Sequence, residues 1–173
     1  GFMDEKGTLN WQAPAGQWRI VRLGYSLTGH ENGPAQHNAT GLETDKFNAE
    51  ALNRYLDTYL QFYSNENGEL FDGITGLLSY SIESGPQNAG TELLDAFAAA
   101  MPYDVTPWLP ALTGEVISGA AETDRFLWDY RRFLSQTLNT AHYATIAAKA
   151  EKLGLDYYTE ALEDHRPQLG NDI

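Results

Sequence analysis

The chain has 173 residues, of which 42% are hydrophobic and 20% charged, values typical of one folded globular domain. Its 11 Lys and Arg residues face 24 Asp and Glu residues, which gives a formal net charge of -13. This charge repels phosphate backbones and therefore argues against nucleic-acid binding. The lack of cysteine excludes disulfides and thiolate metal sites, and no apolar run is long enough to predict a membrane span.

The first quarter of the chain predicts two strands followed by a long loop. Residues 9–11 and 18–27 are apolar and β-branched, with a turn signal at residues 13–16 between them, so we expect an N-terminal β-hairpin. Residues 28–46 are rich in Gly, Asn, His and Pro and have no periodicity. A loop of this length is uncommon in a compact domain unless it has a function.

The next part of the chain predicts a helix, a strand and a second helix. Asn48 is the expected N-cap of an amphipathic helix over residues 49–64. Residues 74–82 are apolar without helical spacing and predict a buried strand. A short helix is expected to follow, from a cap at Thr91 to Ala100.

The C-terminal part predicts the longest helix and a second strand. Prolines at positions 102, 107 and 110 are expected to keep the chain before it non-helical. Residues 122–153 then carry apolar side chains along one face, and Gly154 supplies the stop signal. Residues 155–159 predict a strand.

Strands that alternate with helices predict parallel α/β units. A closed (β/α)8 barrel takes roughly 250 residues, so this chain is long enough for about three of the eight units. We therefore predict an α/β fold, a partial (β/α)8 TIM-barrel segment with an N-terminal β-hairpin. The hairpin would take residues 1–27, the loop 28–46 and the βα units 47–173. The chain starts at Gly1 rather than at an initiator methionine, and it stops at residues 172–173 within a segment that looks unfinished. Both observations favour a piece of a longer protein.

Two glutamates, Glu83 and Glu160, each follow a predicted parallel strand. In a barrel, the loops at the carboxyl ends of the strands converge on the active site. Paired carboxylates are typical of glycosidic bond cleavage, in which one protonates the leaving oxygen and the other activates water or attacks the sugar. The alternative interpretation is that each glutamate is a solvated loop acid.

The long loop carries a second set of polar side chains, which includes Glu43 and Asp45. Four more polar residues precede them: His30, Asn32, His37 and Asn38. Such a cluster could hold Ca²⁺ or bind sugar hydroxyls, but Asp45 could equally only support the start of the next helix. The histidines lack the spacing of a zinc site.

The chain has four Trp, ten Tyr and seven Phe residues, and aromatic rings can stack on a sugar. Phe126 and Trp128 lie within the predicted long helix and are expected to be core residues. Trp108, which lies between prolines, is the residue that we expect to be available for substrate binding.

Several strings, in one order over nearly the whole chain, resemble glycoside hydrolase family 106, the α-L-rhamnosidases. They lie at residues 11–18 (WQAPAGQW), 19–24 (RIVRLG), 28–29 (TG), 34–35 (PA), 41–46 (GLETDK), 107–114 (PWLPALTG), 125–132 (RFLWDYRR) and 160–170 (EALEDHRPQLG). The resemblance implies a large enzyme with a (β/α)8 catalytic domain that hydrolyses terminal α-L-rhamnosides with inversion. It also implies further β-domains outside this chain, calcium near the sugar in some relatives, and a periplasmic or secreted location.

The family's catalytic stretch reads Asp-Ser-(Tyr or Ile)-Glu-x-Gly-x-Gln-Asn-Trp-Thr, and residues 80–90 of this chain read YSIESGPQNAG. The resemblance places Glu83 on the family's glutamate, the general acid, and it also matches Gln87 and Asn88. Tyr80 stands in place of the family's Asp, and residues 89–90 replace Trp-Thr. Loss of an acid three residues before Glu83 removes a charge that could tune its pKa or bind the sugar.

The resemblance also bears on the second carboxylate. Glu160 matches a glutamate at a strand end of the family, whereas the family's general base comes from farther along the chain, beyond residue 173. Glu160 is therefore expected to be an active-site wall residue that is a candidate for catalysis.

Together these observations predict a rhamnosidase-like glycosidase that acts on an oligosaccharide with terminal α-L-rhamnosyl groups, of the kind found in plant glycans. Glu83 and Glu160 are its candidate catalytic residues, with Glu43, Asp45, Gln87, Asn88 and Trp108 as candidate substrate-binding residues. One alternative is a catalytically degenerate carbohydrate-binding relative, which Tyr80 and Ala89 favour. The other is a helix-rich interaction module, whose sign would be an exposed apolar face on residues 122–153.

Overall fold

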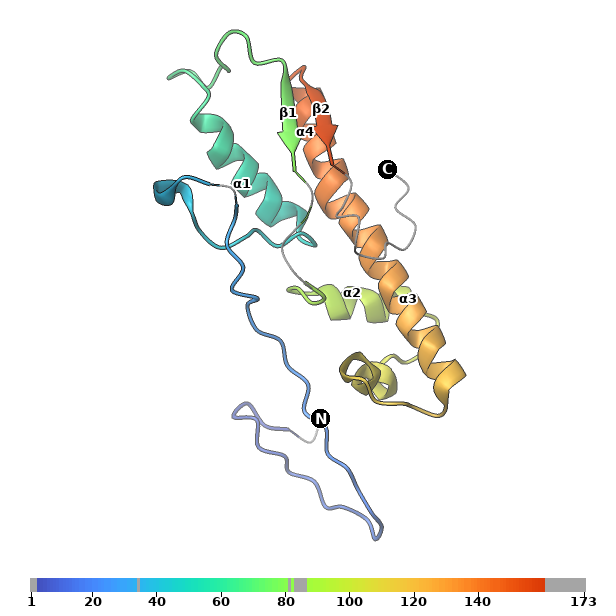
Figure 1. Cartoon of the computed structure of the whole chain (residues 1–173). Coiled ribbons are helices and arrows are strands. Elements are labelled where there is room, and N and C mark those ends of the chain that lie inside the picture. The colour runs from blue at the N-terminus through green and yellow to red at the C-terminus, as the bar shows by residue number, and fades with distance from the viewer. Residues whose placement is uncertain (1–2, 34, 81, 83–86, 161–173) are drawn as a thin grey trace.

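The computed structural model describes residues 3–33, 35–80, 82 and 87–160 (Figure 1). In the described part, the elements in chain order are η1 (His37–Ala39), α1 (Ala49–Gln61), β1 (Gly76–Ser79), α2 (Leu93–Ala100), η2 (Thr106–Thr113), α3 (Ala120–Leu138), η3 (Asn139–Tyr143), α4 (Ala144–Lys152) and β2 (Asp156–Thr159). The segments η1 and η2 are 3-10 helices, and η3 is a π-helical turn. The fold is therefore a helix-rich mixture of α and β structure.

The two strands pair in parallel, in a register that runs from Gly76↔Asp156 to Ser79↔Thr159. Helices α1 and α4 run beside the pair, and the carboxyl ends of both strands point the same way (Figure 1). A Cβ atom on Gly76 would lie 3.1 Å from the backbone oxygen of Asp156 and 3.2 Å from the Tyr158 ring. Glycine at this position therefore allows the two strands to approach closely.

The strand pair packs on α1 and α4 through a small aliphatic core. Leu52 and Leu56 of α1 and Ile146 of α4 are buried there, and Leu77 and Tyr157 of the strands pack against them. Leu52 and Leu56 are four residues apart and so lie on one helix face. One face of the strand pair is thus turned toward the helices.

A second, aromatic core joins α2, η2 and α3. Its buried residues are Phe97, Val105, Ala111, Phe126 and Tyr130. The ring of Phe97 contacts Phe126 and Tyr130 edge-on, with centroids 5.9 and 5.0 Å apart. Phe126 and Tyr130 confirm the core face that helical spacing predicts for this helix, whereas the prediction of Trp128 as a core residue is wrong, because it points off this face and is 50% exposed.

The predicted helix over residues 122–153 is confirmed as one nearly continuous rod, α3–η3–α4 (Figure 1). The sequence does not reveal the π turn in its middle, where the Ala144 amide donates to the carbonyl of Asn139. The Thr140 and Thr145 hydroxyls also donate to backbone carbonyls here, 3.1 and 3.4 Å away. Such side-chain bonds compete with the regular helical pattern and accompany a local change of pitch.

The predicted N-terminal hairpin is wrong. Residues 9–27 form no strand, and the local pairing is an isolated antiparallel bridge between Met3 and Leu9. The turn signal does fold the chain back, since the Trp18 indole donates to the carbonyl of Pro14 and meets the Trp11 ring edge-on at 5.0 Å. β-branched residues favour a strand only where a partner strand and a buried face exist, and this segment is exposed.

The other elements lie where the sequence predicts them, with shorter bounds, since α1 ends at Gln61 rather than at residue 64 and β1 covers Gly76–Ser79 of the predicted 74–82. Asn48 caps α1 as predicted, because its side chain accepts from the Ala51 amide at 2.9 Å. The predicted cap at Thr91 is wrong, since Glu92 occupies the N-cap of α2 with a φ of 65°. The stretch predicted to be non-helical contains the 3-10 helix η2, which admits Pro107 in its first turn, where no amide donor is needed.

None of the helices in the described residues combines the length and the apolar character that crossing a lipid bilayer requires.

Truncation of the aromatic core is predicted to destabilise the fold far more than truncation of an exposed ring. Phe97 is 0% exposed and Phe62 is 76% exposed, so each serves as the control for the other. Phe97→Ala should lower the free energy of unfolding by about 3–5 kcal/mol, whereas Phe62→Ala should change it by less than about 0.5 kcal/mol. Urea titration of the protein followed by tryptophan fluorescence measures both, and equal losses would contradict this description of the core.

Candidate active site

The carboxyl ends of β1 and β2 place the candidate residue Glu160 beside Tyr80. The Glu160 amide donates to the Ser79 carbonyl at 3.2 Å, which continues the strand pairing by one residue beyond the register of Ser79 and Thr159. Tyr80 and Glu160 therefore occupy neighbouring positions, and both side chains are exposed. Glu83 lies outside the described residues, three positions after Tyr80 along the chain.

Asp45 and Gln87 form the central hydrogen bond of the candidate site. The Gln87 amide nitrogen donates to Oδ1 of Asp45 at 2.7 Å, and the Phe47 backbone amide donates to the same oxygen at 2.9 Å. Gly90 lies against this carboxylate, because a Cβ there would come within 3.0 Å of Oδ2. The long loop and the loop after β1 thus meet at Asp45.

Glu43 and Lys46 add an ion pair to the same loop. The Lys46 ammonium lies 2.5 Å from the Glu43 carboxylate, and only 14% of the lysine side chain and 24% of the glutamate side chain are exposed. The Lys46 backbone amide also donates to the Gln87 side-chain oxygen at 3.3 Å. Glu43, Asp45 and Gln87 therefore belong to one connected polar cluster, as their common assignment to a substrate site requires.

Asn88 connects this cluster to the aromatic core. The Tyr130 hydroxyl donates to the Asn88 carbonyl at 2.6 Å, while the Asn88 side chain belongs to an exposed residue. Burial raises the pKa of Tyr130, so its hydroxyl keeps the proton that it donates. This hydrogen bond ties the backbone at Asn88 to helix α3.

Trp108 lies in a different place. Its ring is nearly parallel to the Phe126 ring, with centroids 6.2 Å apart, and it packs against the aromatic core. The described contacts of Trp108 are those of a packing residue. They do not join it to the cluster of Asp45 and Gln87.

His142 is a residue of this region that the sequence analysis missed. It lies in the π turn, is 5% exposed, and its Nδ1 has no hydrogen-bond partner among the described residues; the side-chain oxygen of Asn139 is in the same situation. Burial and, to a smaller extent, the positive charge of Lys46 lower the pKa of His142 to about 4. A histidine four residues after Leu138, on the predicted apolar side of the helix, was the signal in the sequence.

Two tyrosines of α1 and a third just after its end form an exposed row beside this cluster. The rings of Tyr55, Tyr59 and Tyr63 follow at spacings of four residues, with successive centroids 6.1 and 5.1 Å apart. The hydrogen bond to Tyr63, then burial, raises the pKa of Tyr59 to about 12, with a minor contribution from Tyr80. Burial also raises the pKa of Tyr55, so the phenols of Tyr55 and Tyr59 remain protonated over the physiological range of pH.

The described residues do not fit a Ca²⁺ site. In that part of the chain, no three acidic or histidine side chains gather closely enough to hold a metal ion. Glu43 is paired with Lys46, and Asp45 accepts two hydrogen bonds. Ca²⁺ takes six to eight oxygen ligands, which these two carboxylates do not supply.

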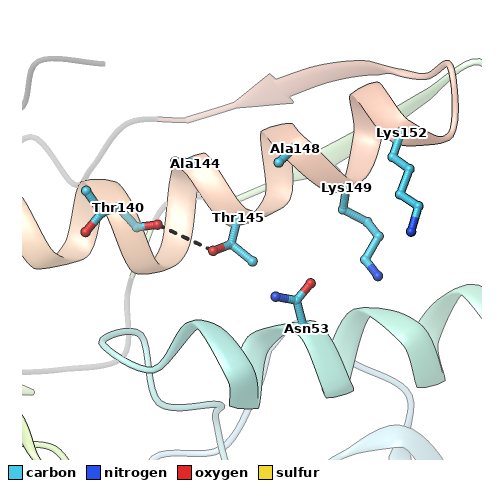
Figure 2. A pocket seen from close by; sticks show the side chains of 7 residues that line it. All are labelled: Asn53, Thr140, Ala144, Thr145, Ala148, Lys149 and Lys152. Carbon is cyan, nitrogen blue, oxygen red and sulfur yellow. Dashed lines mark hydrogen bonds between the residues drawn. The ribbon is translucent and has the colours of Figure 1, made fainter.

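A groove of about 360 Å³ lies between α1 and α4, away from the candidate residues (Figure 2). Its lining is Asn53, Thr140, Ala144, Thr145, Ala148, Lys149 and Lys152. The ammonium of Lys149 bonds to Asp57 at 2.6 Å and so ties α4 to α1. Lys149 and Lys152 lie in the last turn of α4, where a positive charge offsets the partial negative charge of the helix C-terminus. The lysines that line the groove therefore have a structural role in packing α4 against α1.

Acidic and amide side chains at the carboxyl end of parallel strands are an arrangement that many α/β enzymes share. The whole chain, residues 1–173, matches the family model of glycoside hydrolase family 106, whose description is alpha-L-rhamnosidase. The chain therefore belongs to this family of α-L-rhamnosidases, as the resemblance in the sequence predicts.

Two relatives extend this finding. The structure of a rhamnosidase from Novosphingobium sp. PP1Y is 46% identical, superposes with a TM-score of 0.84, and is matched over 98% of this chain and 17% of its own length. A protein of Formosa agariphila named putative beta-glucuronidase is 32% identical over 159 residues, which are 91% of this chain and 14% of that protein. The chain thus spans less than a fifth of either relative.

The buried His142 is predicted to make stability depend on pH. Its pKa in the folded state is about 4, against 6.5 as the ordinary value, so between these pH values the unfolded chain binds a proton that the folded chain does not. The stabilisation is complete above pH 6.5 and is lost as the pH falls toward 4, by about 3 kcal/mol in total.

His142→Gln should remove this part of the pH dependence of the unfolding midpoint. The same substitution at the exposed His37 serves as the control. Urea titrations at pH 7, 5.5 and 4 measure the effect. A His142→Gln protein with the pH slope of the unsubstituted protein would contradict the assignment.

Proposed function

We propose that this chain is part of the catalytic domain of an enzyme that removes terminal α-L-rhamnosyl groups from plant-type glycans, with inversion. Within it, residues 1–27 would form an entry segment, 28–46 a loop at the sugar, and 47–173 βα units of a (β/α)8 barrel. The active enzyme includes the rest of the parent protein, and the chain alone is expected to be inactive. Membership of the rhamnosidase family supports the proposal.

The observation that carries the proposal is the position of Glu160 at the carboxyl edge, beside the end of the strand that leads to Glu83. Parallel strands with helices on one face present their carboxyl ends to one side, where barrel enzymes build their active sites. The polar cluster of Asp45 and Gln87 adds acceptors and donors suited to sugar hydroxyls. Two carboxylates and a polar lining are what hydrolysis of a glycoside requires.

In the proposed reaction, Glu83 is neutral at first and donates its proton to the glycosidic oxygen as the bond to the sugar breaks. Water attacks the opposite face of the sugar, and a carboxylate removes a proton from it. Inversion requires the two carboxyl groups to stand about 6.5–9.5 Å apart, which leaves room for this water. Glu160 either acts as that base or lines the site while a residue beyond this chain does so.

A second candidate function is sugar binding without turnover. It is favoured by Tyr80, a neutral side chain where the family stretch carries an acid, and by residues 89–90, which replace Trp-Thr. Gly90 has its own packing reason in this chain, since it makes room for the Asp45 carboxylate. Tyr80 is therefore the stronger argument for this candidate.

The helix-rich interaction module has less support. The exposed residues of α3 are mostly charged or small, and Trp128, 50% exposed, is the large apolar exception in that helix. Arg132 covers the Trp128 ring, with its guanidinium carbon 5.3 Å from the centroid. This surface lacks the continuous apolar area that a docking helix presents.

Glu83→Gln in the full-length protein is predicted to lower rhamnose release by about 10²–10⁴-fold, because an amide cannot protonate the leaving oxygen. The loss should be larger for a disaccharide than for a nitrophenyl rhamnoside, since nitrophenolate leaves without a proton. A chromogenic assay and a reducing-sugar assay measure the two substrates.

Glu92→Gln is the matched control, because Glu92 is an exposed glutamate at the start of α2. Retained activity in Glu83→Gln would contradict its role as acid. An unsubstituted protein that binds rhamnose and releases none would favour the binding function instead.

A further inference from the structure

The face of the strand pair that is turned away from the helices carries its own set of side chains. Side chains alternate along a strand, so Leu78 points opposite to Leu77, which packs on the helices, and Tyr80 follows directly after Ser79, the last paired residue of β1. Tyr158 of β2 pairs with Leu78. The alternation agrees with exposure, since Leu78 is 61% and Tyr158 60% exposed.

Tyr80 and Tyr158 differ in their surroundings: Tyr80 lies near enough to Tyr59 of α1 to contribute to the raised pKa of that residue, whereas Tyr158 lies on the opposite face from Leu77. The Tyr158 ring lies over Gly76, at the amino end of β1, and its hydroxyl bonds to Asp156 at 3.4 Å. Tyr158 therefore leans back along the strand, away from the carboxyl edge. Leu78 is the residue of β1 that pairs with Tyr158. Tyr80 lies two residues after Leu78 and is therefore at the carboxyl edge itself.

Tyr80 and Glu160 together offer what a sugar needs from a protein. The ring presents an apolar surface to C–H groups, while its hydroxyl and the neighbouring carboxylate exchange hydrogen bonds with ring hydroxyls. Neighbouring parallel strands lie about 4.8 Å apart, so one pyranose ring can contact both side chains. No hydrogen bond between Tyr80 and another described residue competes for the phenol.

We infer that Tyr80 is a sugar-contacting, specificity-determining residue that acts with Glu160 at the carboxyl edge, while Tyr158 has no contact with the sugar. This inference rests on the proposed function, since it assigns the sugar of that site to the carboxyl edge of the strand pair, where Tyr80 and Glu160 lie side by side. Tyr80 then contributes to sugar binding, independently of whether it takes over a role in turnover from the Asp of the family stretch.

The test compares Tyr80→Phe, Tyr80→Ala and Tyr158→Phe in the full-length protein. The phenylalanine variants each remove one hydroxyl from rings of nearly equal exposure, 62% for Tyr80 and 60% for Tyr158. Loss of one hydrogen bond to the sugar is expected to raise KM about 2–12-fold in Tyr80→Phe with kcat nearly unchanged. Tyr80→Ala should raise KM further, and Tyr158→Phe should leave KM unchanged.

Calorimetric titration with L-rhamnose and melting curves of all variants complete the test. A weaker affinity for L-rhamnose in the Tyr80 variants, with unchanged melting temperatures, supports the inference even in a protein without turnover. Equal effects of Tyr80→Phe and Tyr158→Phe, or none in either, would overturn it. Turnover that persists unchanged in Tyr80→Ala would overturn the inference and leave the proposed function standing, whereas a protein with neither turnover nor binding would overturn both.

Discussion

The parallel pairing of β1 and β2 is the constraint on which the rest of the structure depends. It joins segments that start at Gly76 and Asp156, far apart in the chain, and only a crossover through α2, α3 and α4 makes this pairing possible. Two short strands are marginal by themselves, so the aliphatic core under them supplies the stability that their hydrogen bonds lack. Because the pairing is parallel, the chain after each strand emerges at the same edge, and Glu160 comes to lie beside Tyr80.

Two side-chain hydrogen bonds hold the segments next to this edge in place. Asp45 and Gln87 join the long loop to the loop after β1, and Tyr130 holds the Asn88 carbonyl from the aromatic core. Each of these bonds gives a polar group a hydrogen-bond partner, so residues 45–47 and 87–90 are held in place without helix or strand structure. The buried His142 lies close enough to Lys46 for the lysine charge to lower its pKa. Because His142 stays neutral, no second positive charge arises near the ion pair of Lys46 and Glu43.

Helical spacing predicted α1 and the long helix, and short apolar runs without that spacing predicted both strands, because these signals are local in the sequence. The N-terminal hairpin failed for a non-local reason, since residues 18–27 have strand-forming side chains but no partner strand in the described chain. The π turn was missed because bonds from threonine hydroxyls to the backbone accompany it. His142 was missed although its helical spacing from Leu138 placed it on the apolar side of the helix. For the site, the sequence predicted Glu43, Asp45 and Gln87 separately. Their bonding to one another depends on tertiary packing, as does the place of Trp108 in the core.

The most direct test of this account is a crystal structure of the full-length protein with an unhydrolysed thio-rhamnoside bound. We predict the sugar at the carboxyl edge of β1 and β2, in contact with Tyr80 and Glu160, with a Glu83 carboxyl oxygen within hydrogen-bond distance of the glycosidic sulfur. A sugar bound elsewhere, for example in the groove between α1 and α4, would contradict it. So would Glu83 and Glu160 on opposite faces of the fold.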